Sequence, residues 1–232
     1  MTLRTAVFAS GGGSNFQALL DHQSRAGSWE IVLLVTDRSD AGALDRARVE
    51  GVATVVVPNA GRETVEAERD LLEVLDEHGI ELILLAGYLK LVPRGVVARY
   101  GGRMLNIHPA LLPKFGGKGM YGMRVHRAVI EAGDAESGAT VHFVDEEYDR
   151  GAILAQRRVP VLDGDTPEAL AARVLAVEHR LYPAAVDHLC EAVAAGTSPE
   201  PMLEERAASD ASAERPWKAP PPQPRETTEK LQ

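Results

Sequence analysis

The first half of the chain alternates continuous apolar runs with amphipathic stretches. The apolar runs occupy residues 5–9, 29–36, 53–57, 81–86 and 104–108. Runs of this length without polar alternation are typical of parallel strands that are buried on both faces. Apolar positions recur at helical spacing between the runs and predict helices after residue 15 and over residues 41–50, 62–78, 93–100 and 124–132. The alternation predicts an α/β fold with a doubly wound, mostly parallel sheet.

The second half of the chain follows a different pattern. Residues 139–144 alternate as a strand, residues 145–151 form an acidic turn, and residues 153–161 form the return strand of an antiparallel hairpin. A long helix begins after Thr166, and Pro183 is expected to kink or interrupt it. The pattern predicts one folded domain over residues 1–204. A disordered, proline-rich tail is predicted over residues 205–232.

Three further expectations concern the sides of the predicted helices. The apolar side of the stretch 62–78 is expected to consist of Val65, Leu71, Leu72 and Leu75. In the long helix, the polar pair Glu178 and His179 is best interpreted as solvated. Cys190 lies in an apolar run and is expected to fill the core.

Two polar residues stand out at the end of the last apolar run. Side chains two apart in a strand share a face, so Asn106 and His108 are expected to point the same way. Pro109 disfavours further pairing and places both near the carboxyl end of the strand, where open α/β sheets bind ligands. An amide donor beside an imidazole suits a reaction that polarises a carbonyl and moves a proton. A histidine held by local backbone is an equally good interpretation of these residues alone.

A glycine-rich turn joins the first strand to the first helix. Residues 10–15 read Ser-Gly-Gly-Gly-Ser-Asn, and free N–H groups at such a helix start can receive a phosphate. The turn matches neither G-x-G-x-x-G nor a phosphate loop with lysine, so a single phosphate is favoured over a dinucleotide or triphosphate. Asn15 is suited either to capping the helix or to contacting the ligand. The alternative is a tight turn that binds nothing.

Two loops could carry further chemistry. Residues 114–122 are glycine-rich and basic, which is typical of a mobile lid or binding loop and also of an ordinary surface loop. The acidic turn 145–151 could bind a metal or orient a histidine, although clustered acids are usually only solvated.

Composition limits the classes of function. The 232 residues are 45% hydrophobic and 25% charged, as in ordinary globular proteins, and the formal charge is −9. This charge argues against nonspecific binding to nucleic acid or to an anionic membrane. A single cysteine excludes an intrachain disulfide and a thiolate-rich metal site. Neither a signal peptide nor a membrane-spanning run is recognisable, so we expect a cytoplasmic protein.

Several motifs in the same order resemble the phosphoribosylglycinamide formyltransferase family, folate-dependent enzymes of purine biosynthesis. The resemblance covers roughly residues 4–200 and rests on the segments 10–15, 85–88, 105–113 and 138–144, with Asp149 beyond them. It implies a Rossmann-like formyltransferase fold. It also implies formyl transfer from the co-substrate 10-formyltetrahydrofolate to the amine of glycinamide ribonucleotide, without a metal. The implied partners are small molecules and a second copy of the chain in a homodimer.

The resemblance also implies roles for individual residues. The catalytic trio would be Asn106, His108 and Asp149. The ribonucleotide-binding set would be Gly12, Gly13, Ser14, Asn15 and Glu178. The folate-binding set would be Arg62, Leu89, Lys90, Leu91, Val92, Asn106, Asp145, Glu146, Glu147, Tyr148 and Asp149. The glycine-rich segment 115–122 is longer than in many members, and Leu89 and Lys90 stand where other members carry Met and Arg.

Alternatives to this function stay open at this point. Asn-x-His followed later by Asp is shared by the wider formyltransferase group. A deformylase, or a formyltransferase with a different amine acceptor, is therefore the nearest rival. A non-catalytic module that binds a phosphorylated metabolite would use the glycine turn but would not need the trio.

Overall fold

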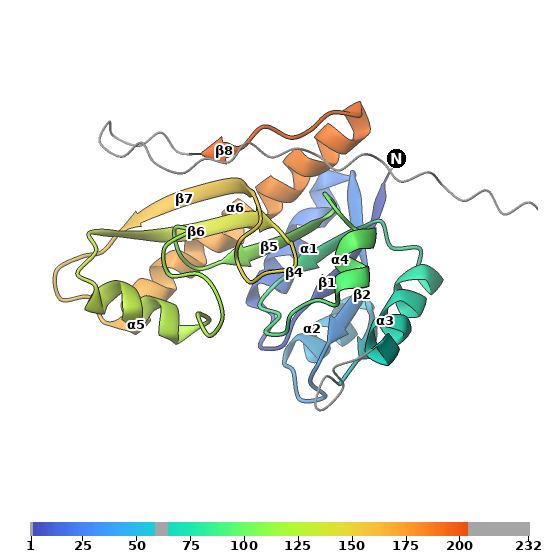
Figure 1. Ribbon diagram of the computed structural model, residues 1–232, viewed down its shortest axis with the longest axis horizontal. Helices are drawn as coiled ribbons and strands as arrows, with labels where there is room; N and C mark the ends of the chain where they lie inside the picture. Colours follow the sequence, from blue (N-terminus) through green and yellow to red (C-terminus); the bar gives the residue numbers. More distant parts are fainter. Residues whose placement is uncertain (1, 59–64, 204–232) are drawn as a thin grey trace, which may run out of the picture.

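The fold in our computed structural model is an eight-stranded sheet with helices packed on both faces (Figure 1). The structure describes residues 2–58 and 65–203, apart from the side chains of residues 24–26. The strands are β1 (Leu3–Phe8), β2 (Trp29–Thr36), β3 (Ala53–Val56), β4 (Leu82–Leu85), β5 (Met104–His108), β6 (Glu136–Phe143), β7 (Ile153–Pro160) and β8 (Met202–Leu203). The helices are α1 (Ser14–Ala26), α2 (Ala43–Glu50), α3 (Val65–Glu77), α4 (Arg94–Arg99), α5 (Met123–Glu131) and α6 (Pro167–Ala195).

The strand order is β3-β2-β1-β4-β5-β6-β7-β8. All neighbours from β3 to β5 pair in parallel, β6 is antiparallel to both β5 and β7, and β8 is parallel to β7. The predicted α/β fold, mostly parallel with an antiparallel hairpin, is confirmed. The short strand β8 was not predicted, because two residues carry no periodic signal.

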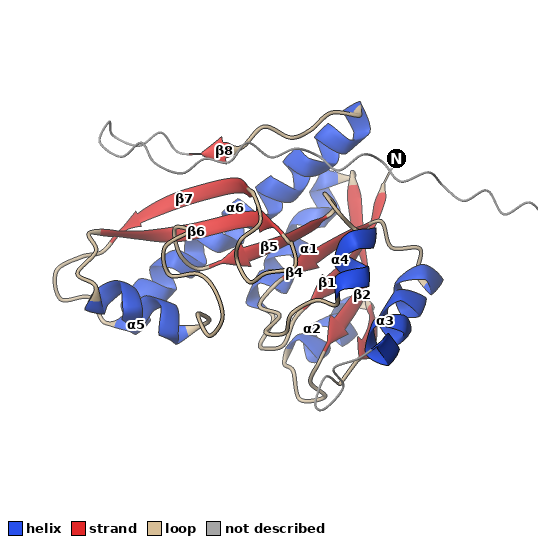
Figure 2. Ribbon diagram, in the orientation of Figure 1, coloured by secondary structure: helices blue, strands red, loops and turns tan. Residues whose placement is uncertain are grey.

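The chain leaves β1 and β4 toward opposite faces of the sheet. Helix α1 follows β1 and packs with α2, α5 and α6 on one face, whereas α3 and α4 pack on the other (Figure 2). Neighbouring strands whose connections diverge in this way leave a crevice at their carboxyl ends, where open α/β sheets bind ligands. The rims of this crevice are tied together, because Ser10 N–H donates to Gly87 O (3.1 Å) and Leu89 N–H donates to Ser10 Oγ (3.0 Å).

Successive residues of each central strand contribute to different cores. In β4, Leu82 and Leu84 belong to the core under α6, while Ile83 and Leu85 belong to the core under α3 and α4. Both faces are therefore buried, which is why the strand reads as a continuous apolar run. Tyr182 of α6 reinforces the centre of the sheet, with its hydroxyl 3.1 Å from Leu85 O and 3.0 Å from the carbonyl oxygen of the neighbouring strand β5.

Two expectations about helices are wrong. Val65 is 83% exposed, because it lies about 200° around α3 from Ala67 in the buried stripe that continues through Leu71 and Leu75. Pro183 does not interrupt α6, which is assigned as helix through Ala195. Pro183 and the preceding Tyr182 are buried, so packing outweighs the lost backbone hydrogen bond.

Other expectations have mixed outcomes. Cys190 is buried, as expected. Strand β6 begins at Glu136 rather than at residue 139, because its pairing with β7 extends to Pro160. The predicted tail over residues 205–232 lies outside the described residues. Within the described part of the chain, no helix is both long and apolar enough to cross a membrane.

Candidate active site

A cavity of about 630 Å³ opens at the crevice and extends over β5. Its walls are the glycine turn after β1, the chain after β4, the end of β5, the loop before α5, and one side of α6. Leu105 and Ile107 of β5 point to the α6 core, so Asn106 and His108 point to the opposite face. In residues 2–58 and 65–203, no helix covers that face at β5 and β6. The loop joining β6 to β7 folds over it instead and brings Asp149 to β5 (Figure 1).

The structure brings the predicted catalytic trio together. Asp149 Oδ1 lies 3.5 Å from Asn106 Nδ2 and 3.6 Å from His108 Nδ1. All three side chains line the cavity, and that of His108 is only 4% exposed. An amide, an imidazole and a carboxylate can therefore act on one bound molecule.

The tautomer of His108 follows from its backbone partner. Nε2 lies 2.9 Å from Phe115 O, and a carbonyl can only accept, so Nε2 carries a hydrogen. In the neutral ring, Nδ1 is then an unprotonated acceptor that faces Asp149. Burial lowers the pKa of His108, and the nearby Asp149 carboxylate opposes this shift. The free site therefore favours neutral His108.

His142 is a site residue that the sequence reasoning missed. Its Nδ1–H donates to Phe143 O (2.8 Å), so its Nε2 is free to accept a hydrogen bond from Asn106 Nδ2 (2.9 Å). This contact orients the Asn106 amide with its N–H groups toward His142 and Asp149. The pairing of Asn106 with His142 in the antiparallel β5–β6 ladder creates it. Only that register, and no local motif, could have revealed the role.

Asp149 is held by contacts on both of its oxygens. Oδ2 accepts a hydrogen bond from Gly117 N–H (2.8 Å), which ties the carboxylate to the loop before α5. The backbone of Asp149 is left-handed, with φ of 56°. Burial alone would raise the pKa of Asp149, but His142, His108 and the Gly117 N–H together lower it. The carboxylate is therefore ionised at neutral pH.

The glycine turn is shaped by close packing. Gly13 is left-handed (φ 71°), and a Cβ there would lie 2.9 Å from Ala43 Cβ. Gly13 is also the N-cap of α1, so the expectation that Asn15 caps the helix is wrong. Asn15 Nδ2 instead donates to Glu178 Oε2 (2.5 Å), and both side chains line the cavity. The first N–H groups of α1 have no intrahelical acceptor, as at any helix start, and can receive an anion.

Glu178 is buried, so its interpretation as a solvated residue is wrong. Its exposed fraction is 7%, and burial raises the pKa of its carboxyl group, opposed by the hydrogen bond from Asn15. All five residues of the predicted ribonucleotide-binding set, Gly12, Gly13, Ser14, Asn15 and Glu178, line the cavity. Whether they bind a ribonucleotide stays a prediction.

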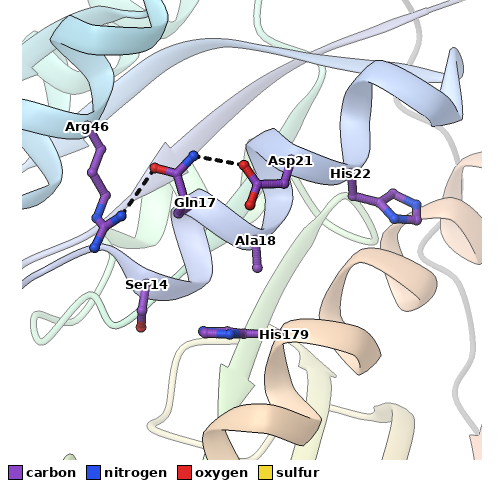
Figure 3. Close-up of a pocket in the computed structure, with 7 residues that line it drawn as sticks. All are labelled: Ser14, Gln17, Ala18, Asp21, His22, Arg46 and His179. Carbon is purple, nitrogen blue, oxygen red and sulfur yellow. Dashed lines mark hydrogen bonds between the residues drawn. The ribbon is translucent and has the colours of Figure 1, made fainter.

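A second cavity of about 410 Å³ lies along α1, between Arg46 of α2 and His179 of α6 (Figure 3). Arg46 reaches across from α2, donates to Gly12 O (2.8 Å) and Gln17 Oε1 (3.2 Å), and so braces the turn from behind. His179 of α6 and Ser14 of α1 also line this cavity. Ser14 is shared with the larger cavity, so the two cavities meet at the first residue of α1.

The predicted folate-binding set is only partly brought together. Leu89, Asn106, Tyr148 and Asp149 line the cavity. Lys90, Leu91, Val92, Asp145, Glu146 and Glu147 do not. Arg62 lies outside the described residues. Among the residues that are described, no group of three or more His, Cys, Asp or Glu side chains could hold a metal ion.

An open α/β sheet that carries an amide, an imidazole and a carboxylate beside a glycine turn at a helix start is typical of a group-transfer enzyme. Residues 3–186 match the family described as formyl transferase, and the chain belongs to that family. The family resemblance drawn from the motifs is thereby confirmed.

The relatives narrow the class. The chain is 50% identical over 191 residues to the chloroplastic phosphoribosylglycinamide formyltransferase of Arabidopsis thaliana, covering 81% of this chain and 65% of that one. It is 37% identical over 183 residues to the Escherichia coli phosphoribosylglycinamide formyltransferase, covering 78% and 84%. It also superimposes on glycinamide ribonucleotide transformylase 1 from Symbiobacterium toebii with a TM-score of 0.75 and 40% identity, over 82% and 88% of the two chains. The chain spans just under two thirds of the length of the plant relative.

Proposed function

We propose that this chain transfers a formyl group from 10-formyltetrahydrofolate to the amine of 5′-phosphoribosylglycinamide. The products are N-formyl glycinamide ribonucleotide and tetrahydrofolate, in de novo purine biosynthesis. The observation that carries the proposal is the convergence of Asn106, His108 and Asp149 in a cavity that also ends at the glycine turn. The names of the relatives from Arabidopsis thaliana and Escherichia coli support the choice of substrate.

Asn106 supplies the donor for the developing oxyanion. The substrate amine attacks the formyl carbon, and the carbonyl oxygen becomes negative in the tetrahedral intermediate. The 3.5 Å contact from Asn106 to Asp149 is longer than its 2.9 Å contact to His142, so it is the one that an oxyanion replaces. His142 acts as a positioning residue, because its Nε2 holds the second amide hydrogen and prevents the amide from turning. One such donor lowers the activation barrier by about 3 to 4 kcal/mol.

His108 and Asp149 move the proton. The attacking nitrogen must lose a proton, and the folate nitrogen must gain one as its bond to the formyl carbon breaks. Neutral His108 accepts the proton at Nδ1, directly or through a water, and Asp149 stabilises the imidazolium that forms. The protonated ring then donates this proton to the folate nitrogen. No step requires a metal or a covalent intermediate.

The remaining assignments follow the same proposal. Residues 12–15 and Glu178 bind the ribonucleotide. The folate lies against Leu89 and the turn 145–149, and the other members of the predicted folate set contact the part of the folate that extends beyond the cavity. A cytoplasmic location and a homodimer stay predictions.

A tetrahydrofolate assay tests the proposal against its rivals. The purified protein is given 10-formyltetrahydrofolate with and without glycinamide ribonucleotide, and tetrahydrofolate formation is followed spectroscopically. Formation that requires the ribonucleotide supports the proposal. Formation without it indicates a deformylase. Formation only with another amine indicates a different acceptor, and no formation with any amine indicates a binding module.

A further inference from the structure

The basic residues near the cavity form two groups, those whose side chains line it and those whose side chains do not. Four basic residues of the described chain belong to segments next to the site, namely Lys90, Lys114, Lys118 and Arg124. In the described part of the chain, Lys118 and Arg124 are the only Lys or Arg side chains that line the cavity. Lys114 points elsewhere and pairs with Asp134 at 2.6 Å.

Lys118 and Arg124 are not engaged by acidic side chains. Among the described residues, neither side chain forms an ion pair or a hydrogen bond, and the contact of the Arg124 guanidinium is a stacking on the Tyr121 ring at 4.9 Å. They stand in a protein of net charge −9, beside a cavity that already holds the Asp149 carboxylate. Unpaired cations in such a place raise the local concentration of an anionic ligand that the whole molecule would repel.

Among the residues that the structure describes, no Lys or Arg from the other walls near the glycine turn lines the cavity. The side of α6 that lines the cavity contributes Ala171, Leu175 and Glu178. Arg46 lies behind the turn, with its Nε bound to Gly12 O. A phosphate that reaches the turn therefore meets backbone N–H groups from α1, and its charge is unmatched unless the opposite wall supplies the cations.

We propose that Lys118 and Arg124 bind the phosphate of the ribonucleotide from the side opposite the glycine turn and so determine specificity for a phosphorylated acceptor. The proposal rests on the proposed function. Helix α5, which begins one residue before Arg124, packs against α6. Both cations line the cavity, Lys118 from the loop before α5 and Arg124 from the first turn of α5.

A buried group on the same wall indicates that it faces a ligand. His126 is 4% exposed and lines the cavity, and its Nδ1 has no hydrogen-bond partner among the described residues. A buried polar atom without a partner is costly, and a bound molecule would satisfy it. The wall formed by residues 117–126 is also tied to the chemistry, because Gly117 N–H holds Asp149.

Kinetics with the variants Lys118→Ala and Arg124→Ala test the proposal. We expect each to raise KM for glycinamide ribonucleotide by about 10- to 100-fold, the range for losing a hydrogen bond to a charged group. KM for 10-formyltetrahydrofolate should stay unchanged, and Lys118→Arg should recover most of the loss. With glycinamide riboside, which lacks the phosphate, the variants and the wild type should behave alike. Arg127→Ala is the matched control, because Arg127 is exposed on the same helix and does not line the cavity.

Each other outcome overturns the proposal in a recognisable way. A rise in KM for the folate alone would show that the cations bind the folate carboxylates. An equal effect in Arg127→Ala would show a general charge effect, and unchanged kinetics would show that the turn alone holds the phosphate. Calorimetric titration with ribose 5-phosphate gives a readout that does not depend on turnover. If the wild type does not formylate the ribonucleotide, the proposed function fails, whereas weaker ribose 5-phosphate binding by the variants would still support the phosphate site.

Discussion

Replacing Asp149 by Asn isolates the role of the carboxylate charge. The backbone at this position is left-handed, a conformation that Asn tolerates better than most residues, so the variant should fold. An Asn oxygen can still accept the Gly117 N–H. The change therefore removes a charge 3.6 Å from His108 Nδ1 with little disturbance of the shape of the site.

The size of the effect follows from that distance. An opposite charge this close raises the pKa of a histidine by about 1 to 3 units, which is about 1.4 to 4 kcal/mol of imidazolium stabilisation. We expect turnover to fall by about 10- to 1,000-fold in Asp149→Asn. The pKa of His108 is already lowered by burial, and without the carboxylate it falls further. His108 must be neutral to accept a proton, so the acidic limb of kcat/KM should move to lower pH.

The assay is tetrahydrofolate formation, measured at saturating substrates for kcat and over a range of ribonucleotide concentrations for kcat/KM, and repeated from acidic to alkaline pH. His108→Ala should also lose most turnover, while both variants still bind the ribonucleotide in calorimetry. Asp134→Asn is the control, because Asp134 pairs with Lys114 outside the cavity. Near-normal turnover in both Asp149→Asn and His108→Ala, or an acidic limb that does not move, would refute the reasoning.

Three further predictions concern separate parts of the site. Asn106→Ala removes the oxyanion donor and should lower kcat by about 100- to 1,000-fold in single-turnover kinetics; an unchanged kcat would contradict this role. Tyr182→Phe leaves the carbonyl oxygens of β4 and β5 without the hydroxyl and should lower the free energy of unfolding by about 1 kcal/mol in urea, with activity retained. The pKa of Glu178 is raised by burial, so its contribution to stability is fully present below the unfolded pKa and is lost as pH rises through the folded pKa. Glu178→Gln should therefore be more stable than the wild type at neutral pH and should show a weaker pH dependence; the opposite order in urea denaturation across pH would contradict burial as the cause.

Local patterns predicted the sheet and two of the three residues of the catalytic trio. The central strands are recognisable because both of their faces are buried, and Asn106 and His108 share a face because side chains alternate along β5. Asp149 lies 43 positions after Asn106, and no local pattern relates the two residues. The family resemblance supplied that residue. His142 was missed for the same physical reason, since its role depends on the register between β5 and β6.

The burial of Glu178 was within reach of the sequence. The buried stripe of α6 includes Val174 and Leu181, and Glu178 follows the first by four residues and precedes the second by three. Helical geometry therefore places Glu178 on the buried side. The general rule that carboxylates are solvated gave the wrong answer, because Asn15 provides the hydrogen bond that makes the burial tolerable.

The antiparallel end of the sheet is what makes the proposed chemistry possible. A parallel strand after β5 would require a crossover helix, and that helix would cover the face on which Asn106 and His108 lie. Antiparallel β6 leaves this face free of helices and places His142 directly opposite Asn106. The loop after β6 then returns Asp149 over β5. The sheet is parallel from β3 to β5, and the change of strand direction at β6 therefore orients the Asn106 amide and brings the Asp149 carboxylate to β5. A shift of the β5–β6 register should abolish catalysis even if the fold is retained.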